Sequence, residues 1–227
     1  MNRTFLILLM IGTAMMITVI SQHKSVNNLD YMPWEVDRLE NGSIRVFAIT
    51  LGKTTIQEAN QIFASFAQTR LIQNDSIADR PAYQLIARYN DLSIGGLIAE
   101  VQLQYQLDEA QLLALLKNLE ISDSSEFKKA PDENIKEYKI DQQTEMSYLS
   151  TPIAGITYIP FIDYGKETIR QRFGLATKEL TINKNEEQWL YPELDLKIFI
   201  YADRPDRFVY YRPKNRNDAS DTSEEKK

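Results

Sequence analysis

Alternating apolar and polar positions predict a chain rich in half-buried strands. The clearest stretch covers residues 97–107, where every odd position is apolar and positions 100, 102, 104 and 106 are Glu or Gln. This period of two is typical of an antiparallel strand with one face on the core and one face in water. Weaker patterns predict further strands at residues 44–49, 71–72, 83–89, 153–159, 176–182, 188–191, 194–201 and 207–212, and one within 138–149.

Turn-forming residues separate these stretches. Asn41-Gly42 predicts a turn before the first strand, and Asn90-Asp91 predicts a hairpin turn after residues 83–89. Gly95-Gly96 is interpreted as a bulge or bend near the start of the strand at 97–107. Asp203-Arg204-Pro205-Asp206 predicts the turn before the last strand, because proline fixes a φ angle there.

Two stretches have the period of amphipathic helices. Thr55 with Glu58, or Thr54 with Gln57, forms a capping box that satisfies the first free amides of a helix. The core-facing side of that helix, about three turns long, comprises Ile56, Ala59, Ile62, Phe63 and Phe66.

A second helix begins after Asp108, which with Gln111 forms its cap. Its leucine stripe over residues 112–119 packs on the sheet or on the second half of the chain. The alternative is a helix that binds a partner.

A short motif occurs twice. Gly52-Lys53-Thr54-Thr55 looks like a phosphate-binding loop, but Phe47 stands where that loop needs a glycine, so no nucleotide site is expected. The motif returns as Gly165-Lys166-Glu167-Thr168, and five positions agree between windows 49–56 and 162–169. The second copy opens a short helix with Ile169 and Phe173 inward and Gly174 at its end. The shared order of elements predicts a duplicated unit.

The unit resembles the small outer-membrane lipoprotein family called SmpA/OmlA or BamE-like. The matching landmarks, loosely over residues 40–125 and 150–213, are Leu51-Gly52-Lys53-Thr54, Phe173-Gly174 and Trp189-Leu190-Tyr191. A tandem pair also resembles the two-repeat β-lactamase inhibitor proteins. The lipidated cysteine of the family is absent, and Ala64 replaces the glycine after the first helix. The resemblance implies an envelope protein that binds proteins or lipid head groups rather than an enzyme, and it transfers no site residues.

Residues 5–20 are apolar and follow Arg3, which is typical of a segment directed to a membrane. The run is slightly shorter than the roughly 20 residues that cross a bilayer upright. We expect an uncleaved anchor in the inner membrane, single-pass, with the rest of the chain outside the cytoplasm. Two alternatives remain: a signal peptide whose cleavage leaves a secreted or periplasmic protein, and a buried soluble helix.

The predicted fold class is α+β, with an N-terminal transmembrane or signal helix followed by two helix-plus-antiparallel-sheet units. The segments are 1–24 (anchor or signal peptide), 25–41 (spacer), 42–120 (first unit), 121–135 (linker), 136–213 (second unit) and 214–227 (disordered tail). Residues 25–41 have an alternative interpretation as an irregular segment that packs on the domain through Trp34.

Composition excludes several kinds of chemistry. The 227 residues are 43% hydrophobic and 26% charged, as in ordinary folded proteins, and the net charge of -6 gives no support to nucleic-acid binding. The absence of cysteine removes disulfides, thiolate metal sites and cysteine nucleophiles. The single histidine, His23, nearly excludes a histidine metal centre or catalytic triad. No cofactor, metal or catalytic residue is therefore predicted.

Aromatic and arginine residues crowd the second half, and strand alternation must bring some of them to the surface. Because such residues dominate protein interfaces, the candidate binding patch comprises Trp189, Tyr191, Tyr201, Arg204, Arg207, Tyr210, Tyr211 and Arg212. The arginines suit anionic lipid or an acidic partner. The alternative is a sheet face covered by the first half or by the linker.

Three functional hypotheses follow. The first is a membrane-anchored cell-envelope protein that acts by binding, as an assembly or accessory factor. The second is a carboxylate-based enzyme on the outer face of the membrane, which requires acidic residues such as Asp203 and Asp206 to converge in a cleft with raised pKa values. The third is a two-repeat inhibitory or structural module, which a concave sheet lined by Tyr and Trp would favour.

Overall fold

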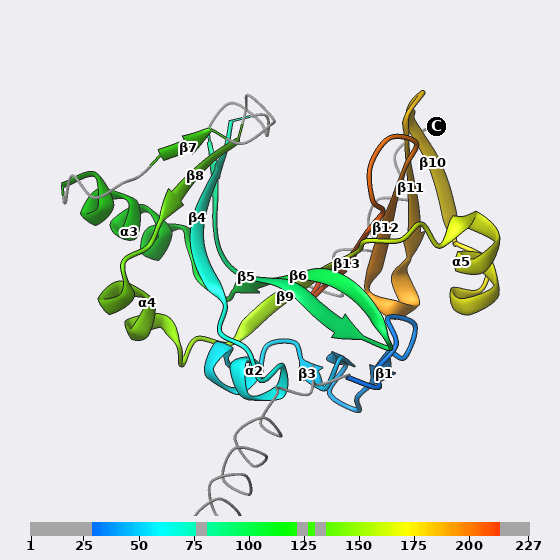
Figure 1. The fold of residues 1–227 in the computed structure, drawn as a ribbon, viewed down its shortest axis with the longest axis horizontal. Helices are drawn as coiled ribbons and strands as arrows, with labels where there is room; N and C mark the ends of the chain where they lie inside the picture. Colours follow the sequence, from blue (N-terminus) through cyan, green and yellow to red (C-terminus); the bar gives the residue numbers. More distant parts are fainter. Residues whose placement is uncertain (1–28, 76–80, 122–126, 130–134, 214–227) are drawn as a thin grey trace, which may run out of the picture.

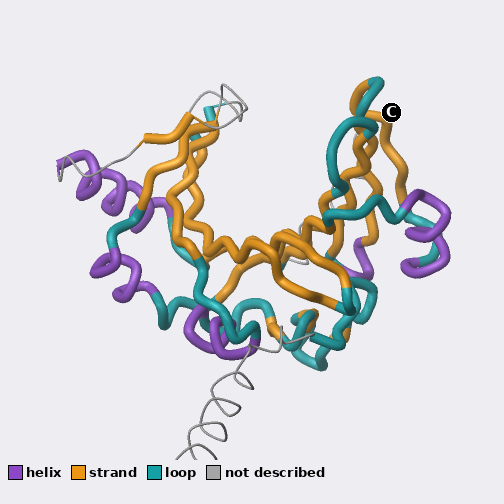
Figure 2. The backbone as a smooth tube through the Cα atoms, viewed as in Figure 1, coloured by secondary structure: helices purple, strands orange, loops and turns teal. Residues whose placement is uncertain are grey.

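The computed structural model describes residues 29–75, 81–121, 127–129 and 135–213. They form an α+β fold with one ten-stranded antiparallel sheet and one three-stranded sheet, which confirms the predicted class. The large sheet bends into an open arch, and the labelled helices lie on its outer side (Figure 1). The tube in Figure 2 shows that the inner side of the arch carries no described helix.

The strands of the arch follow the order β10-β11-β12-β13-β9-β6-β5-β4-β8-β7. The first limb contains β7 (Phe127–Lys129), β8 (Ile135–Lys139), β4 (Gln68–Asn74) and the start of β5 (Ala82–Ile94). The floor contains the rest of β5, β6 (Leu97–Tyr105) and β9 (Ile153–Pro160). The second limb contains β10 (Lys178–Asn183), β11 (Glu186–Tyr191), β12 (Leu196–Tyr201) and β13 (Arg207–Tyr211).

The strands that the sequence assigns to two units are joined in this one sheet. β6 from the first half pairs with β9 from the second, from Ala99 opposite Pro160 to Tyr105 opposite Ile153. The pairing satisfies backbone groups that two separate sheets would leave at open edges. β7 lies within residues 121–135, predicted as a linker, and pairs with β8.

The bulge and the turn between residues 83 and 107 lie at the opposite positions from those predicted. The predicted hairpin turn at Asn90-Asp91 is wrong, because these residues form a bulge inside β5, and Asp91 has a φ of 55°. The hairpin turn lies instead at Gly95-Gly96, between the paired residues Ile94 and Leu97. Gly95 and Gly96 have φ values of 57° and 79°. This is the left-handed conformation that a two-residue type I′ turn requires.

Residues 44–49, predicted as a single strand, form a hairpin. β2 (Ile44–Val46) pairs with β3 (Ile49–Thr50) on one side and with β1 (Asp37–Arg38) on the other. Phe47 and Ala48 form the turn with φ values of 53° and 61°. Phe47 is fully buried, and its ring centre lies 5.4 Å from that of Tyr158. Tertiary packing therefore favours a turn that local preference disfavours.

α2 (Ile56–Ile62) begins at one of the two predicted capping boxes. Thr55 Oγ1 accepts a hydrogen bond from the Glu58 amide, and the Glu58 carboxylate accepts one from the Thr55 amide. The predicted apolar face is confirmed as far as Phe63, but Phe66 is 89% exposed. The helix is shorter than expected because Ala64 adopts a left-handed φ of 46° just after its end.

The other helices also lie outside the arch. α3 (Glu109–Ile121) has the predicted cap at Asp108, and most of its leucine stripe is buried against the sheet. The prediction of a strand within residues 138–149 is wrong beyond Lys139. Asp141 Oδ1 accepts a hydrogen bond from the Thr144 amide and so caps the start of α4 (Gln142–Tyr148). α5 (Gly165–Phe173) ends at Gly174 as predicted. A 3-10 helix, η1 (Pro192–Leu194), occupies the first residue of the strand predicted at 194–201.

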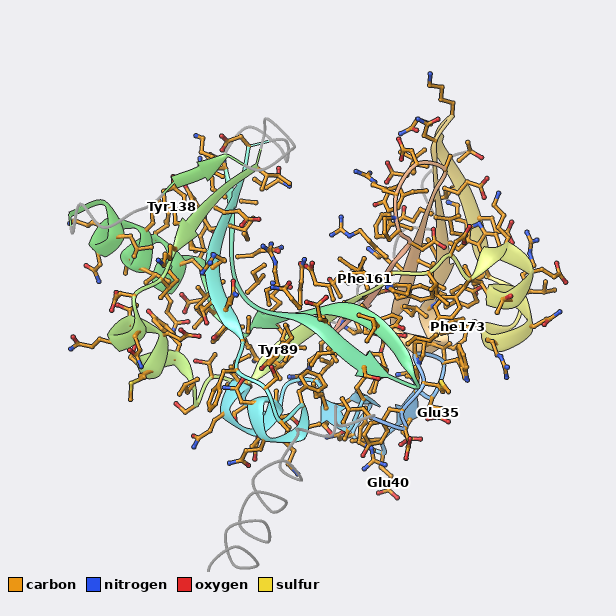
Figure 3. The ribbon with its side chains drawn as sticks, in the orientation of Figure 1. Glu35, Glu40, Tyr89, Tyr138, Phe161 and Phe173 are labelled. Atoms are coloured by element: carbon orange, nitrogen blue, oxygen red, sulfur yellow. The ribbon has the colours of Figure 1, made fainter. Side chains whose placement is uncertain are left out.

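The core lies between the sheet and the elements outside it. Tyr89 of β5 lies between the floor and α2 (Figure 3), and its ring centre is 4.9 Å from that of Phe63. The Tyr89 hydroxyl donates a 2.7 Å hydrogen bond to Asn60 Oδ1. Burial raises the pKa of Tyr105 on the adjacent strand to about 12, so this hydroxyl stays neutral and serves as a hydrogen-bonding group.

Residues 29–41 pack on the outer side of the second limb, which favours the packed segment over the spacer. The Trp34 ring meets Tyr164 and Phe173 edge-on, with ring centres 6.0 and 6.4 Å away. The Arg172 guanidinium lies 4.7 Å above the same indole. The buried Tyr210 hydroxyl donates to the Pro33 carbonyl.

The predicted anchor, residues 1–24, and the predicted tail, residues 214–227, lie outside the described residues. Among the residues that the structure does describe, no helix combines the length and the apolar composition needed to cross a bilayer.

Candidate functional site

Two cross-strand rows distinguish the faces of the arch. Residues paired across neighbouring strands point to the same side of a sheet. One such row crosses eight strands, has no buried member and consists of Gln68, Arg88, Gln102, Thr157, Val209, Lys197, Leu190 and Lys178. The adjacent row is entirely buried and consists of Thr69, Ala87, Leu103, Ile156, Tyr210, Leu196 and Tyr191. The first row therefore marks the inner face, and the second marks the outer face beneath the helices.

The second limb displays aromatic rings and cations together on the inner face. The Phe199 and Tyr201 rings are nearly parallel, at 11°, with centres 6.5 Å apart. The Arg204 guanidinium lies 3.9 Å from the centre of the Tyr201 ring. Lys197 Nζ lies 5.0 Å from the centre of the Tyr211 ring. Arg207 is directly opposite Phe199 on the neighbouring strand.

We call this set the cation–aromatic patch; it consists of Lys197, Phe199, Tyr201, Arg204, Arg207 and Tyr211. The local sequence produces it through strand alternation, because residues 197, 199 and 201 face inward while Leu196, Ile198 and Ile200 are buried. Within the described part of the chain, Lys197, Arg204 and Arg207 form no ion pair with any carboxylate. As far as the described residues show, these three cations are therefore available for an ion pair with a ligand.

The first limb carries a different arrangement, in which one arginine is shared by two glutamates. Arg88 Nη2 lies 2.9 Å from Glu137 Oε1, and Arg88 Nε lies 3.3 Å from Glu100 Oε1. Gln102 Nε2 donates a 2.5 Å hydrogen bond to the same Glu100 oxygen. Arg88 reaches Glu137 across the intervening strand β4, because side chains on the concave side of a curved sheet converge. This network holds its side chains in place and engages its only cation, Arg88, with carboxylates of the same chain.

The predicted patch residues divide between the two faces. Tyr201, Arg204, Arg207 and Tyr211 lie together in the cation–aromatic patch. Trp189, Tyr191 and Tyr210 are buried on the outer face, with exposures of 0, 3 and 0%, so they belong to the core and not to a surface patch. Strand parity separates them, because each is paired with buried residues of the neighbouring strands.

Arg212 is exposed but lies on the outer side, where its guanidinium packs against Gly52. Lys197 and Phe199 are not among the residues predicted for the patch, although they alternate with the apolar residues Leu196, Ile198 and Ile200 in the predicted strand at 194–201. Arg88 and its two glutamate partners are not predicted either, since no local signal joins residues on three different strands.

The two carboxylates of the β12–β13 turn lie in different environments. Asp203 is exposed, whereas Asp206 is buried and accepts a 3.1 Å hydrogen bond from the Tyr201 amide. Burial raises the pKa of Asp206 to about 6. The second oxygen of that carboxylate has no hydrogen-bond partner in the described chain. This difference in environment gives no support to the two residues acting as the acid–base pair of a hydrolase.

A groove of about 740 Å³ opens at one end of the floor. Its walls come from the start of β5, the end of β6, α3 and the end of β13, and include Tyr83, Gln104, Leu112, Tyr211 and Arg212. Tyr211 belongs to both the groove and the cation–aromatic patch, so the groove extends the inner face around the sheet end.

Over the described residues, no three His, Cys, Asp or Glu side chains are placed to hold a metal ion together. Comparisons with protein-family models, with curated proteins and with solved structures return no match to this chain. The inner face must therefore be interpreted from its own geometry.

Proposed function

We propose that this protein is a membrane-anchored cell-envelope protein that binds a protein partner on the inner face of the arch. In this proposal residues 5–20 sit in the inner membrane, the arch lies outside the cytoplasm, and the chain acts as an assembly or accessory factor. The observation that carries the binding role is the pair of cross-strand rows, one buried beneath helices and one left uncovered across eight strands.

The dimensions of the inner face suit a macromolecule better than a small ligand. Strands spaced about 4.8 Å apart give eight strands a span on the order of 30 Å. A protein interface of standard size buries about 800 Å² on each partner. Tyrosine and arginine, which the cation–aromatic patch contains, are also the residues that most often dominate binding energy at such interfaces.

A two-repeat inhibitory or structural module is the second candidate, and the order of elements favours it. α2 is followed by β4, β5 and β6, and α5 is followed by β10, β11 and β12, each series running from a limb toward the floor. This shared order supports a duplicated unit and the likeness to the BamE-like and two-repeat inhibitor architectures. An inhibitor would use the same inner face, with an enzyme as its partner.

The absence of native cysteine allows a direct test by site-specific crosslinking. Single variants Gln102→Cys and Thr157→Cys place a benzophenone maleimide on the floor of the arch. Gln57→Cys and Gln171→Cys place the same group on exposed helix positions outside it. After irradiation in native membranes, we expect a discrete adduct from the two inner positions only. Adducts from all four positions, or from the outer two alone, would contradict inner-face binding.

A further inference from the structure

We infer that the second limb of the arch recognises an acidic, extended segment of the protein partner, with Arg204 and Arg207 as the residues that contact its carboxylates. The inference rests on the proposed function, because it assigns a chemical class to the partner of the same inner face. Four observations carry it: three cations without an ion-pair partner among the described residues, the contact of two of them with aromatic rings, the concave shape, and the net charge of the whole chain.

The cations of the second limb stand out against the charge of the chain. Lys178, Lys197, Arg204 and Arg207 lie on or beside its inner face, and the acidic residues there are Glu186 and Asp203. The chain as a whole has a net charge of -6. A local positive surface on an acidic protein favours encounter with an acidic partner and disfavours others.

The aromatic rings hold two of these cations in place before any partner arrives. Arg204 rests on the face of Tyr201, and Lys197 rests near the face of Tyr211. An arginine held against a ring loses less side-chain freedom when it pairs with a carboxylate, so more of the pairing energy is retained. The same contacts cover ring faces on which nucleic-acid bases would otherwise stack.

The shape of the arch suits an extended protein segment. The two limbs stand on either side of the floor (Figure 1), and Arg204 and Arg207 lie in and next to the turn between β12 and β13. A protein segment can enter between the limbs and follow the strands. In an extended segment, alternate side chains point to the same side, which lets successive carboxylates reach Arg204 and Arg207.

The test uses the full-length chain in detergent and three fluorescent peptides of about twelve residues, long enough to cover several strand positions. They alternate threonine with glutamate, glutamine or lysine. Fluorescence anisotropy gives the dissociation constants at low salt and at about 0.5 M NaCl, where charge interactions are screened within a few ångströms. We expect the glutamate peptide to bind most tightly and to lose affinity in high salt.

Charge-matched variants make the assignment specific. R204Q/R207Q is expected to weaken binding of the glutamate peptide by about tenfold, whereas K53Q/K117Q, which removes two exposed cations outside the arch, should leave it within about twofold. Tyr201→Leu removes the ring beneath Arg204 and should weaken binding by about threefold. All variants should keep the unfolding temperature of the parent, which excludes misfolding as the cause.

Three results would overturn the inference. They are equal binding of the glutamine peptide, no effect of R204Q/R207Q, and tighter binding of oligo-dT or of phosphatidylglycerol vesicles than of the glutamate peptide at equal charge. If one of these results were obtained while Gln102→Cys and Thr157→Cys still gave crosslinks, only the acidic nature of the partner would be rejected. Binding of a partner on the inner face would still be supported. Peptide binding without those crosslinks would instead reject the proposed function in the membrane.

Discussion

The backbone amide of Tyr201 donates a 3.1 Å hydrogen bond to Asp206 Oδ1 and so closes the turn between β12 and β13. The turn carries Arg204, whose guanidinium rests on the Tyr201 ring. The other Asp206 oxygen, Oδ2, is buried without a hydrogen-bond partner among the described residues. The buried Asp206 carboxylate therefore stabilises the turn that carries the exposed Arg204.

The contribution of Asp206 to the stability of the protein should fall as the pH rises through its pKa. Burial, with a smaller contribution from nearby Asp163, raises this pKa from 3.8 to about 6. The folded state therefore holds the proton more tightly than the unfolded state, and the resulting stabilisation is complete below pH 3.8 and lost above about pH 6. In urea unfolding, the Asp206→Asn variant should lack this dependence of the free energy of unfolding on pH. At pH 8 the variant should be about 1–2 kcal/mol more stable than the parent.

Asp203→Asn is the matched control, because it changes the same chemical group in the same turn at an exposed position. This exposed substitution should change the free energy of unfolding by less than about 0.5 kcal/mol. If Asp206→Asn retained the slope of the parent between pH 4 and pH 7, another group would have to account for it.

Removing Arg88 should destabilise the first limb. Arg88→Met leaves Glu100 and Glu137 facing each other without a cation, which is expected to cost about 1–3 kcal/mol in the free energy of unfolding. Adding Glu100→Gln and Glu137→Gln to the same chain should recover most of this loss, because the repulsion disappears. The exposed Arg45–Asp37 pair provides the comparison: Arg45→Met should cost less than about 0.5 kcal/mol.

The hairpin at Gly95-Gly96 gives a prediction in which two neighbours differ. Alanine at either position must adopt a positive φ, so both variants should lose about 1 kcal/mol of stability. A Cβ at Gly95 would also lie 2.4 Å from the Met32 sulfur, whereas a Cβ at Gly96 would meet no atom within 4 Å. Thermal unfolding should therefore rank Gly96→Ala above Gly95→Ala in stability. If Gly95→Ala cost no more than Gly96→Ala when both are made in a Met32→Ala background, the contact with the Met32 sulfur would be confirmed as the cause of the difference.

The sequence predicts those features that depend on short-range periodicity. The strand at 97–107, the caps at Thr55 and Asp108 and the end of α5 at Gly174 all follow from neighbouring residues, and the structure has each of them. Half of the residues of the candidate patch share the inner face, since parity along β12 and β13 separates Tyr201 and Tyr211 from Tyr210. Applying that parity to every aromatic residue would have removed Trp189 and Tyr191 as well.

Features set by contacts between distant residues could not be read from the chain. The pairing of β6 with β9 merges the two predicted units, and no local pattern indicates which strands share an edge. Arg88 meets Glu137 across 49 positions of sequence. The hairpin at Phe47-Ala48 depends on the place that Tyr158 and Tyr210 provide for the Phe47 ring.

Phe47 and Ala48 allow the cost of the left-handed backbone to be separated from the gain of packing. Both residues have positive φ, but only the Phe47 side chain is fully buried. Ala48→Gly should raise the free energy of unfolding by about 0.5–1 kcal/mol, because glycine adopts this conformation without a Cβ clash. Phe47→Gly relieves the same strain but empties a core site, so it should lower stability by about 3–5 kcal/mol. Urea unfolding of the two variants measures both effects. A loss of stability in Ala48→Gly would show that Ala48 contributes packing that outweighs its strain.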